Sequence, residues 1–172
     1  MIVFKVAIRI VKIFARINTR KYMGLYISLL RKLGMNISEY DGTGYIDPTC
    51  YIDSSDYRLI TIGKHVTISR NVTLLTHDFS IGKGLKSVNK TDANKRYKFL
   101  KEIRIGDDVF IGLNAIILPG TNIGKNCIIG SGSVVKGDVP DYSVFVGNPG
   151  KVVYDIRQWA ERHVDEQDYF TC

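Results

Sequence analysis

The stretch IGDDVFIGLNAIILPGTNIGKNCIIGSGSVV, residues 105–135, decides the fold of this chain. An aliphatic residue opens every group of six, at Ile105, Ile111, Ile117, Ile123, Ile129 and Val135. Glycine directly follows four of these residues, and a small or apolar residue stands four places after each of them. Neither a helix nor a strand gives this spacing, because their side-chain periods are about 3.6 and 2 residues. A repeat of fixed length predicts a solenoid, in which each repeat buries its apolar face against its neighbours.

The six-residue period predicts a triangular β-coil, with one short strand and one corner per hexapeptide and three hexapeptides per coil. Residues eighteen apart, such as Ile105 and Ile123, then stack along a narrow core that suits β-branched side chains. The glycine or aspartate after each aliphatic residue is expected at a corner that needs an unusual backbone angle or a short hydrogen-bonding side chain. An earlier stretch keeps the same period at Ile62, Ile68 and Leu74.

Residues 1–36 are expected to form an amphipathic helical segment. A basic stripe at helical spacing comprises Lys5, Arg9, Lys12 and Arg16, beside a broad apolar face. These charges are too frequent for a membrane-spanning run of about 20 apolar residues. Two explanations stay open: residues 1–20 contact an anionic membrane surface, or they pack on the solenoid or a neighbouring subunit. A second helix, over residues 22–33, is expected to cover the open first coil, because solenoids need capped ends.

The rest of the chain divides at two further points. The β-helix domain is expected over residues 37–153, and residues 154–172 form a tail with a short helix. The six-residue period stops after Leu74 and resumes near Ile105, which predicts an inserted loop at about residues 79–102. This loop carries seven basic residues against Asp92 and Glu102 and therefore predicts an anionic partner.

The three cysteines, Cys50, Cys127 and Cys172, show neither disulfide nor metal-ligand spacing. We therefore expect reduced thiols in a cytoplasmic protein, at the inner face of the membrane if the basic helix binds lipid. We expect no bound metal and no nucleic-acid partner.

Three segments together resemble a known family: IGKHVTISRNVTLLTHD at 62–78, the stretch at 105–135, and VGNPGKVV at 146–153. They are similar to the hexapeptide-repeat acyltransferases, above all to the sugar O-acetyltransferases that modify galactosides, maltose, nodulation factors, capsule and lipopolysaccharide. The resemblance implies a mainly β fold, a left-handed parallel β-helix with N-terminal helices, an extruded loop and a short C-terminal helix. It also implies acetyl-CoA as the donor and a homotrimer whose sites lie between subunits.

His77 is the expected catalytic residue. It lies where the period breaks off and the long loop begins, and binding loops are the usual reason for such an insertion. An imidazole has the pKa that a general base needs at neutral pH. The family's catalytic histidine also falls on His77. His65, at a corner, and His163, in the tail, are weaker candidates.

The group that orients His77 is left open, as a backbone carbonyl or another residue. Asp53 and Asp56 are each expected to supply a carboxylate to His77 or to bind a substrate hydroxyl. Asn71 and Asp78 complete the expected substrate-binding set. A backbone N–H at the Asn114 turn is the expected oxyanion donor.

The resemblance also places the donor site. Exposed backbone at small residues suits the amides of the pantetheine arm, and lysines suit the phosphates. The residues that match the family's positions for acetyl-CoA are Gly112, Leu113, Gly130, Ser131, Gly132, Lys136 and Lys151.

The expected function is acetyl transfer from acetyl-CoA to a sugar hydroxyl, in direct transfer with His77 as base, during surface polysaccharide synthesis. Two alternatives stay open: an acetyltransferase of a small non-sugar acceptor such as serine or an antibiotic, and a non-catalytic hexapeptide-repeat scaffold. The identity of the acceptor and the length of the acyl group are not fixed by the sequence.

Overall fold

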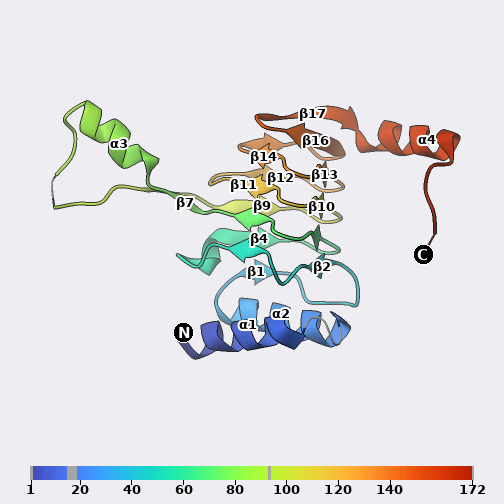
Figure 1. Cartoon of the computed structure of the whole chain (residues 1–172), viewed down its shortest axis with the longest axis horizontal. Helices are drawn as coiled ribbons and strands as arrows, with labels where there is room; N and C mark the ends of the chain where they lie inside the picture. Colours follow the sequence, from blue (N-terminus) through green and yellow to red (C-terminus); the bar gives the residue numbers. More distant parts are fainter. Residues whose placement is uncertain (1, 15–18, 93, 172) are drawn as a thin grey trace.

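The structure, a computed structural model, describes residues 2–14, 19–92 and 94–171. Triangular coils stack on one another, two helices cover the N-terminal end of the stack, and an arm projects from one side (Figure 1). Arg16 of the expected basic stripe and Cys172 lie outside the described residues.

Three sheets of parallel strands form the sides of the coil, and the chain visits sheets A, B and C in turn. Sheet A contains β1 (Asn36–Ile37), β4 (Ile60–Ile62), β9 (Ile103–Ile105), β12 (Asn122–Ile123) and β15 (Asp138–Val139). Sheet B contains β2 (Tyr45–Ile46), β5 (Thr67–Ile68), β10 (Phe110–Ile111), β13 (Ile128–Ile129) and β16 (Ser143–Gly147), with β17 (Gly150–Asp155) antiparallel at its edge. Sheet C contains β3 (Tyr51–Ile52), β6 (Thr73–Leu74), β11 (Ile116–Ile117) and β14 (Val134–Val135).

The register of the strands confirms the predicted stacking. Ile105 pairs with Ile123 in sheet A, Ile111 with Ile129 in sheet B, and Ile117 with Val135 in sheet C. Each pair is eighteen residues apart, so three hexapeptides close one coil. These aliphatic side chains are at most 2% exposed and form the core of the prism.

The small residues at the offset positions also lie inside, as predicted. Ala115, Cys127 and Ser133 are fully buried. Ser133 meets its hydrogen-bonding need by accepting from the Gly147 N–H through Oγ at 3.0 Å. Burial raises the pKa of the Cys127 thiol, so this cysteine acts as a small core residue.

The predicted reason for the repeated glycines is wrong. Gly106, Gly112, Gly124 and Gly130 do not have positive φ; the left-handed residues stand two places later, at Asp108, Asn114, Asn126 and Gly132, with Gly120 between them. Gly106 is needed for close approach, because a Cβ there would lie 2.8 Å from the Gly124 carbonyl carbon in the next coil. Glycine after the aliphatic residue therefore lets successive coils stack closely, and Asn, Asp or Gly makes the turn.

Helix α2 (Thr19–Lys32) covers the N-terminal end of the coil, as predicted for the second helix. Its inner face buries Tyr22, Met23, Tyr26 and Leu30, each at most 2% exposed. The Tyr22 hydroxyl donates to the carbonyl of Ile46 at 3.1 Å. These contacts close the end of the prism and shield the core of the first coil from water.

Helix α1 (Ile2–Phe14) packs beside α2. Two of the predicted stripe residues turn toward the coil: Lys12 donates to the Cys50 carbonyl at 3.1 Å, and Lys5 to the Ser54 carbonyl at 3.4 Å. Val3, Val6 and Ile10 are at least half exposed on the other side. The structure thus shows Lys5 and Lys12 of the basic stripe packed on the coil, while Arg9 is exposed beside the apolar side chains of Val3, Val6 and Ile10.

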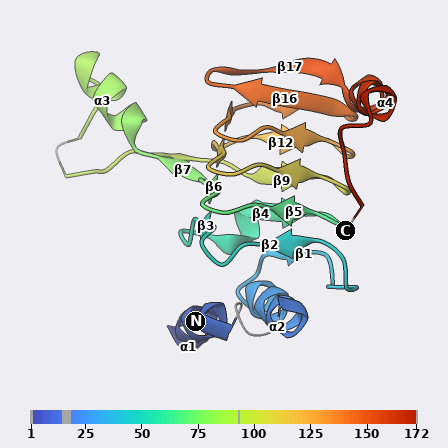
Figure 2. The ribbon, with the colours of Figure 1, turned by 45° about the vertical axis from the view of Figure 1, so that its right-hand side comes forward.

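At the other end of the stack, the hairpin of β16 and β17 borders the last coil, and helix α4 (Ile156–Glu166) follows it. Helix α4 buries none of its residues, and it points away from the side that carries the arm (Figures 1 and 2). The last coil is therefore bordered by a strand, and the short helix expected in residues 154–172 lies beside the stack.

The arm comprises residues 77–102. It leaves the coil through β7 (His77–Asp78), continues into α3 (Ser80–Ser87) and returns through β8 (Phe99–Leu100), which pairs antiparallel with β7. Figure 2 shows the arm well clear of the stack. The expected extruded loop is thus a two-stranded stem with a short helix.

Candidate active site

His77 lies at the point where the arm leaves the coil. Strand β6 ends at Leu74 in sheet C, and the chain reaches sheet A again only at Ile103. The returning strand closes this gap, because the Lys101 N–H donates to the Thr76 carbonyl at 2.9 Å. The corner at which the chain passes from sheet C to sheet A, here the C–A corner, therefore holds His77 on a paired stem.

Asp53 orients His77. It comes from the same corner one coil earlier, and its carboxylate oxygen Oδ2 lies 2.5 Å from His77 Nδ1. The carboxyl group is almost completely buried and accepts from the backbone N–H and the hydroxyl of Thr76, at 3.1 and 2.7 Å. Ser55 adds a backbone donor to Oδ1 at 2.9 Å and places its hydroxyl 3.0 Å from His77 Nδ1.

Asp53 is held in its charged form. Burial alone raises the pKa of a carboxyl group, but the hydrogen bonds from Thr76, Ser55 and His77 outweigh it. The pKa of Asp53 therefore lies well below its ordinary value. A carboxylate at Nδ1 keeps the ring proton on that nitrogen, so Nε2 carries the lone pair that accepts a proton. None of the described residues forms a hydrogen bond with Nε2.

Of the two acidic residues expected near His77, only Asp53 reaches it. Asp56 caps the short 3₁₀ helix η1 (Tyr57–Leu59) and binds the Arg58 guanidinium through both carboxylate oxygens, at 2.9 and 2.8 Å. Hydrogen bonds from Arg58 hold the pKa of Asp56 below its usual value. Its carboxylate is therefore engaged locally.

Asp78 and Lys136 border a hollow beside His77, with an empty volume of about 480 Å³, together with Phe99, Lys101 and Pro119. Asp78 accepts from the backbone N–H and the hydroxyl of Ser80, which lower its pKa, and Lys136 and His77 add to this effect. Lys101 and Lys136 thus border the same hollow as the Asp78 carboxylate, next to His77 in the sequence.

The remaining expected residues lie elsewhere. The corner between sheets B and C, here the B–C corner, holds the positions Asn71, Gly112, Leu113, Gly130, Ser131 and Gly132. Lys151 pairs with Val146 on the terminal hairpin, whose Gly147 reaches Ser133 at this corner. Within one chain, the structure therefore groups most of the expected donor-binding residues together but separates them from His77 by the width of sheet C.

The glycines at the B–C corner have a structural role in the coil. The Gly112 N–H donates to the Ile129 carbonyl at 2.8 Å, and the Gly132 N–H to the Leu113 carbonyl at 2.7 Å. The expected oxyanion donor is also occupied, because the Asn114 N–H donates to the Arg70 carbonyl at 3.0 Å.

Sequence reasoning missed Ser55 and Phe79. The Phe79 ring meets the His77 ring edge-on, with 5.3 Å between ring centroids, and the Arg96 guanidinium lies 4.7 Å from the centroid of Phe79. Ser55 follows Asp53 by two positions, and an aspartate side chain commonly accepts a hydrogen bond from the backbone N–H two residues later. This spacing was visible in the sequence and could have indicated Ser55.

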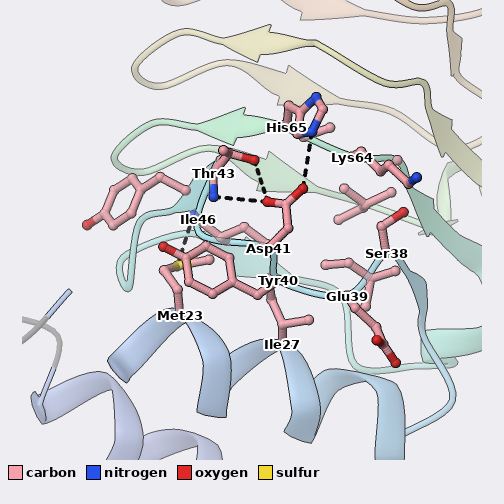
Figure 3. A pocket seen from close by; sticks show the side chains of 16 residues that line it. Met23, Ile27, Ser38, Glu39, Tyr40, Asp41, Thr43, Ile46, Lys64 and His65 are labelled. Atoms are coloured by element: carbon pink, nitrogen blue, oxygen red, sulfur yellow. Dashed lines mark hydrogen bonds and ion pairs between the residues drawn. The ribbon is translucent and has the colours of Figure 1, made fainter. Parts of the chain in front are cut away.

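The other histidines do not form a comparable site. His65 lies 2.9 Å from Asp108 through Nδ1 and 3.1 Å from Asp41 through Nε2, so both ring nitrogens are engaged. Figure 3 shows the contact with Asp41. The hollow next to it is lined by α2, the 38–44 segment and the corner between sheets A and B. His163 lies on α4, close to Glu166 of the same helix and to Asp168 just beyond it, and α4 is on the opposite side of the stack from the arm.

No helix among the described residues is long and apolar enough to span a membrane.

Comparison with known proteins gives consistent results. A family model described as the hexapeptide repeat of succinyl-transferase matches residues 102–136. The chain is 36% identical over 140 residues to Protein CapG of Staphylococcus aureus, covering 81% of this chain and 77% of CapG. It is 36% identical over 110 residues to the galactoside O-acetyltransferase of Escherichia coli K12, covering 64% of this chain and 50% of that enzyme. The chain therefore spans about half the length of the galactoside enzyme.

Among solved structures, a hexapeptide-repeat-containing acetyltransferase from Vibrio cholerae, in complex with acetyl-CoA, resembles this fold. The TM-score is 0.59 at 23% sequence identity, covering 89% of this chain and 87% of that one. The likeness confirms the expected left-handed parallel β-helix.

Proposed function

The chain belongs to the family of hexapeptide-repeat acetyltransferases, which use acetyl-CoA, and from this premise we propose that it acetylates a sugar hydroxyl during surface polysaccharide synthesis. The observation that carries the proposal is the pair formed by buried Asp53 and His77 at the base of the arm. The sugar acceptor is supported by the identity to a galactoside O-acetyltransferase.

His77 is the general base in this proposal. Its Nε2 takes the proton of the acceptor hydroxyl as that oxygen attacks the thioester carbonyl. The C–S bond then breaks, and the same proton passes to the departing thiolate, so the products are the acetyl ester and free CoA. Asp53 fixes the ring tautomer and stabilises the imidazolium that forms between these two steps. The thioester is already activated, so no acyl-enzyme is needed.

The donor site is proposed to lie between subunits of a homotrimer. The residues expected to bind acetyl-CoA gather at the B–C corner, whereas His77 lies at the C–A corner. A neighbouring subunit that presents its B–C corner to His77 would bring Gly112, Ser131 and Lys151 to the base. Lys136, which already borders the His77 hollow, would then contribute from the same chain as His77.

We further propose that the N-terminal helix contacts an anionic membrane surface from the cytoplasmic side. It is supported by the exposed apolar side chains of Val3, Val6 and Ile10, with Arg9 exposed beside them. Co-sedimentation with vesicles containing phosphatidylglycerol tests it. Loss of binding in the Val6→Asp, Ile10→Asp double variant is expected, and equal binding by both proteins would refute it.

The acetyl transfer itself is tested by following CoA release from acetyl-CoA by chromatography across a panel of sugars and nucleotide sugars. Acceptor-dependent release is expected, with a fall of about a hundredfold or more in His77→Ala. His65→Ala, which changes a histidine remote from the arm, is the matched control. Equal rates for the native protein and His77→Ala would remove His77 as the base.

A further inference from the structure

A second hollow lies on the arm itself, outside the residues assigned above to the donor and the base. It is bordered by Phe79, Lys83, Lys86, Asp92, Lys95 and Arg96. Its empty volume, about 1130 Å³, is more than twice that of the hollow beside Asp78. The arm therefore carries a hollow of its own, separate from the one beside Asp78.

The charge of this hollow is strongly positive. Four cationic side chains surround one carboxylate, Asp92, which pairs with Lys95 at 3.5 Å. Lys83 and Lys86 lie three positions apart on α3, so their side chains share one helix face. Within the described part of the chain, neither lysine has a carboxylate partner. A cluster of like charges in a concave surface concentrates anions from solution.

The shape of the hollow is fixed by contacts that do not use the lysine charges. The Asp92 N–H donates to the Tyr97 hydroxyl at 2.9 Å, and the Lys95 N–H donates to the Asp92 carbonyl at 3.0 Å. Arg96 lies over the Phe79 ring at 4.7 Å. The Arg96–Phe79 contact ties the returning segment to the start of the arm, and the other two contacts fix the turn within that segment, so the cations face a formed surface.

Phe79 connects this hollow to the reaction centre. Its ring borders the hollow and also contacts the His77 ring, at 5.3 Å between centroids. A sugar whose hydroxyl reaches His77 would thus have its neighbouring sugar beside Phe79 and in front of the arm cations. An aromatic ring beside cations suits a sugar ring that carries a negative charge.

We propose that the acceptor is an anionic glycan, whose carboxylate or phosphate group binds Lys83, Lys86 and Arg96 while the adjacent sugar presents its hydroxyl to His77. The inference rests on the proposed sugar acetylation and adds the chemical class of the acceptor. The same cations would also suit the phosphates of CoA, and the test separates these two sources.

The test compares two probes that differ only in charge: a trisaccharide of galacturonic acid and its carboxyl-reduced, neutral counterpart. Binding to the native protein is measured by titration calorimetry at low salt, without acetyl-CoA. We expect the acidic probe to bind about tenfold more tightly, because exposed ion pairs are individually weak but several act together. This preference should fall several-fold in the Lys83→Gln, Lys86→Gln double variant.

The control is the Lys64→Gln, Lys90→Gln double variant, which loses the same charge at positions that do not border the arm hollow. It should keep the preference. Equal results for the two probes, including no measurable binding of either, would overturn the proposal. Weaker acetyl-CoA binding by Lys83→Gln, Lys86→Gln, with no preference for the acidic probe, would assign the cations to the donor. A clear acidic preference without acetyl transfer would instead refute only the proposed reaction.

Discussion

Asp53 and His77 stand 24 positions apart in the sequence, yet the Asp53 carboxylate lies 2.5 Å from the His77 ring nitrogen Nδ1. The carboxylate also accepts two hydrogen bonds from Thr76, the residue before His77. One buried group therefore fixes both the backbone at the start of the arm and the orientation of the candidate base.

Replacing Asp53 with asparagine should lower kcat by about a hundredfold, because the tautomer of His77 is no longer fixed and the imidazolium loses its counter-ion. The KM for acetyl-CoA should stay near the native value. Steady-state kinetics with a sugar acceptor measure both constants. Asp56→Asn is the matched control, since Asp56 binds Arg58 and does not contact His77. A native kcat in Asp53→Asn would mean that Ser55 alone orients the ring.

Two inactive variants with lesions at different corners should restore activity when they assemble together. His77→Ala removes the base at the C–A corner, and Leu113→Asp places a charge at the B–C corner. If sites lie between subunits, about a quarter of the interfaces in a one-to-one mixture combine an intact corner of each kind. Co-refolded mixtures should therefore recover about a quarter of the native rate, while separately folded and then combined proteins should not. No recovery after co-refolding would place each site within one subunit.

Alanine at Gly106 should destabilise the protein by about 1–3 kcal/mol, because its Cβ would press on the backbone of the next coil. Gly84→Ala is the control: the position lies in α3 with open space around it, and alanine favours helix by about 1 kcal/mol. Urea unfolding gives both free energies. Equal stability of the two variants would show that the coils can separate at this corner without cost.

His65 should contribute a pH-dependent part of the stability. Its hydrogen bond to Asp108 raises its pKa, with further contributions from the charges of Asp108 and Asp41. A raised pKa stabilises the fold fully below the unfolded value of about 6.5 and loses that effect as pH rises through the folded value. The melting temperatures of the native protein and His65→Gln should therefore differ most at pH 5.5 and converge at alkaline pH.

Lys64→Gln is the control for this experiment, because it changes a neighbouring side chain and leaves the contacts of His65 with Asp108 and Asp41 in place. A difference between the native protein and His65→Gln that is constant with pH would indicate a packing effect of the ring instead.

The coil could be predicted from the sequence because each hexapeptide repeats the same physical requirement, as Ile105, Ile123 and their partners show. The Asp53–His77 pair could not be derived in the same way. Ile52 pairs with Leu74, 22 positions away, since residues 53–59 include the 3₁₀ helix η1 and add four residues to that coil. The eighteen-residue rule therefore fails where the site lies.

The arm was predicted as an insertion but not as a structure. Its stem consists of two short strands, and α3 has only eight residues. These elements are too short for the spacing of apolar residues to indicate a strand or a helix. The charge of the segment was visible in the sequence, whereas its hollow depends on Phe79 and Tyr97, whose contacts form only in the folded chain.

Because the coils repeat every eighteen residues, only insertions or deletions of eighteen residues keep the later residues at their own corners. Deleting six residues between Ile105 and Val135 would move every later residue back to the preceding corner. Lys136 would then move from the C–A corner, where His77 lies, to the B–C corner. Deleting eighteen residues would return Lys136 to its own corner, one coil closer to the arm. Natural length variation in this part of the chain should therefore occur in whole coils, while the arm, which lies outside the register, is free to vary by single residues.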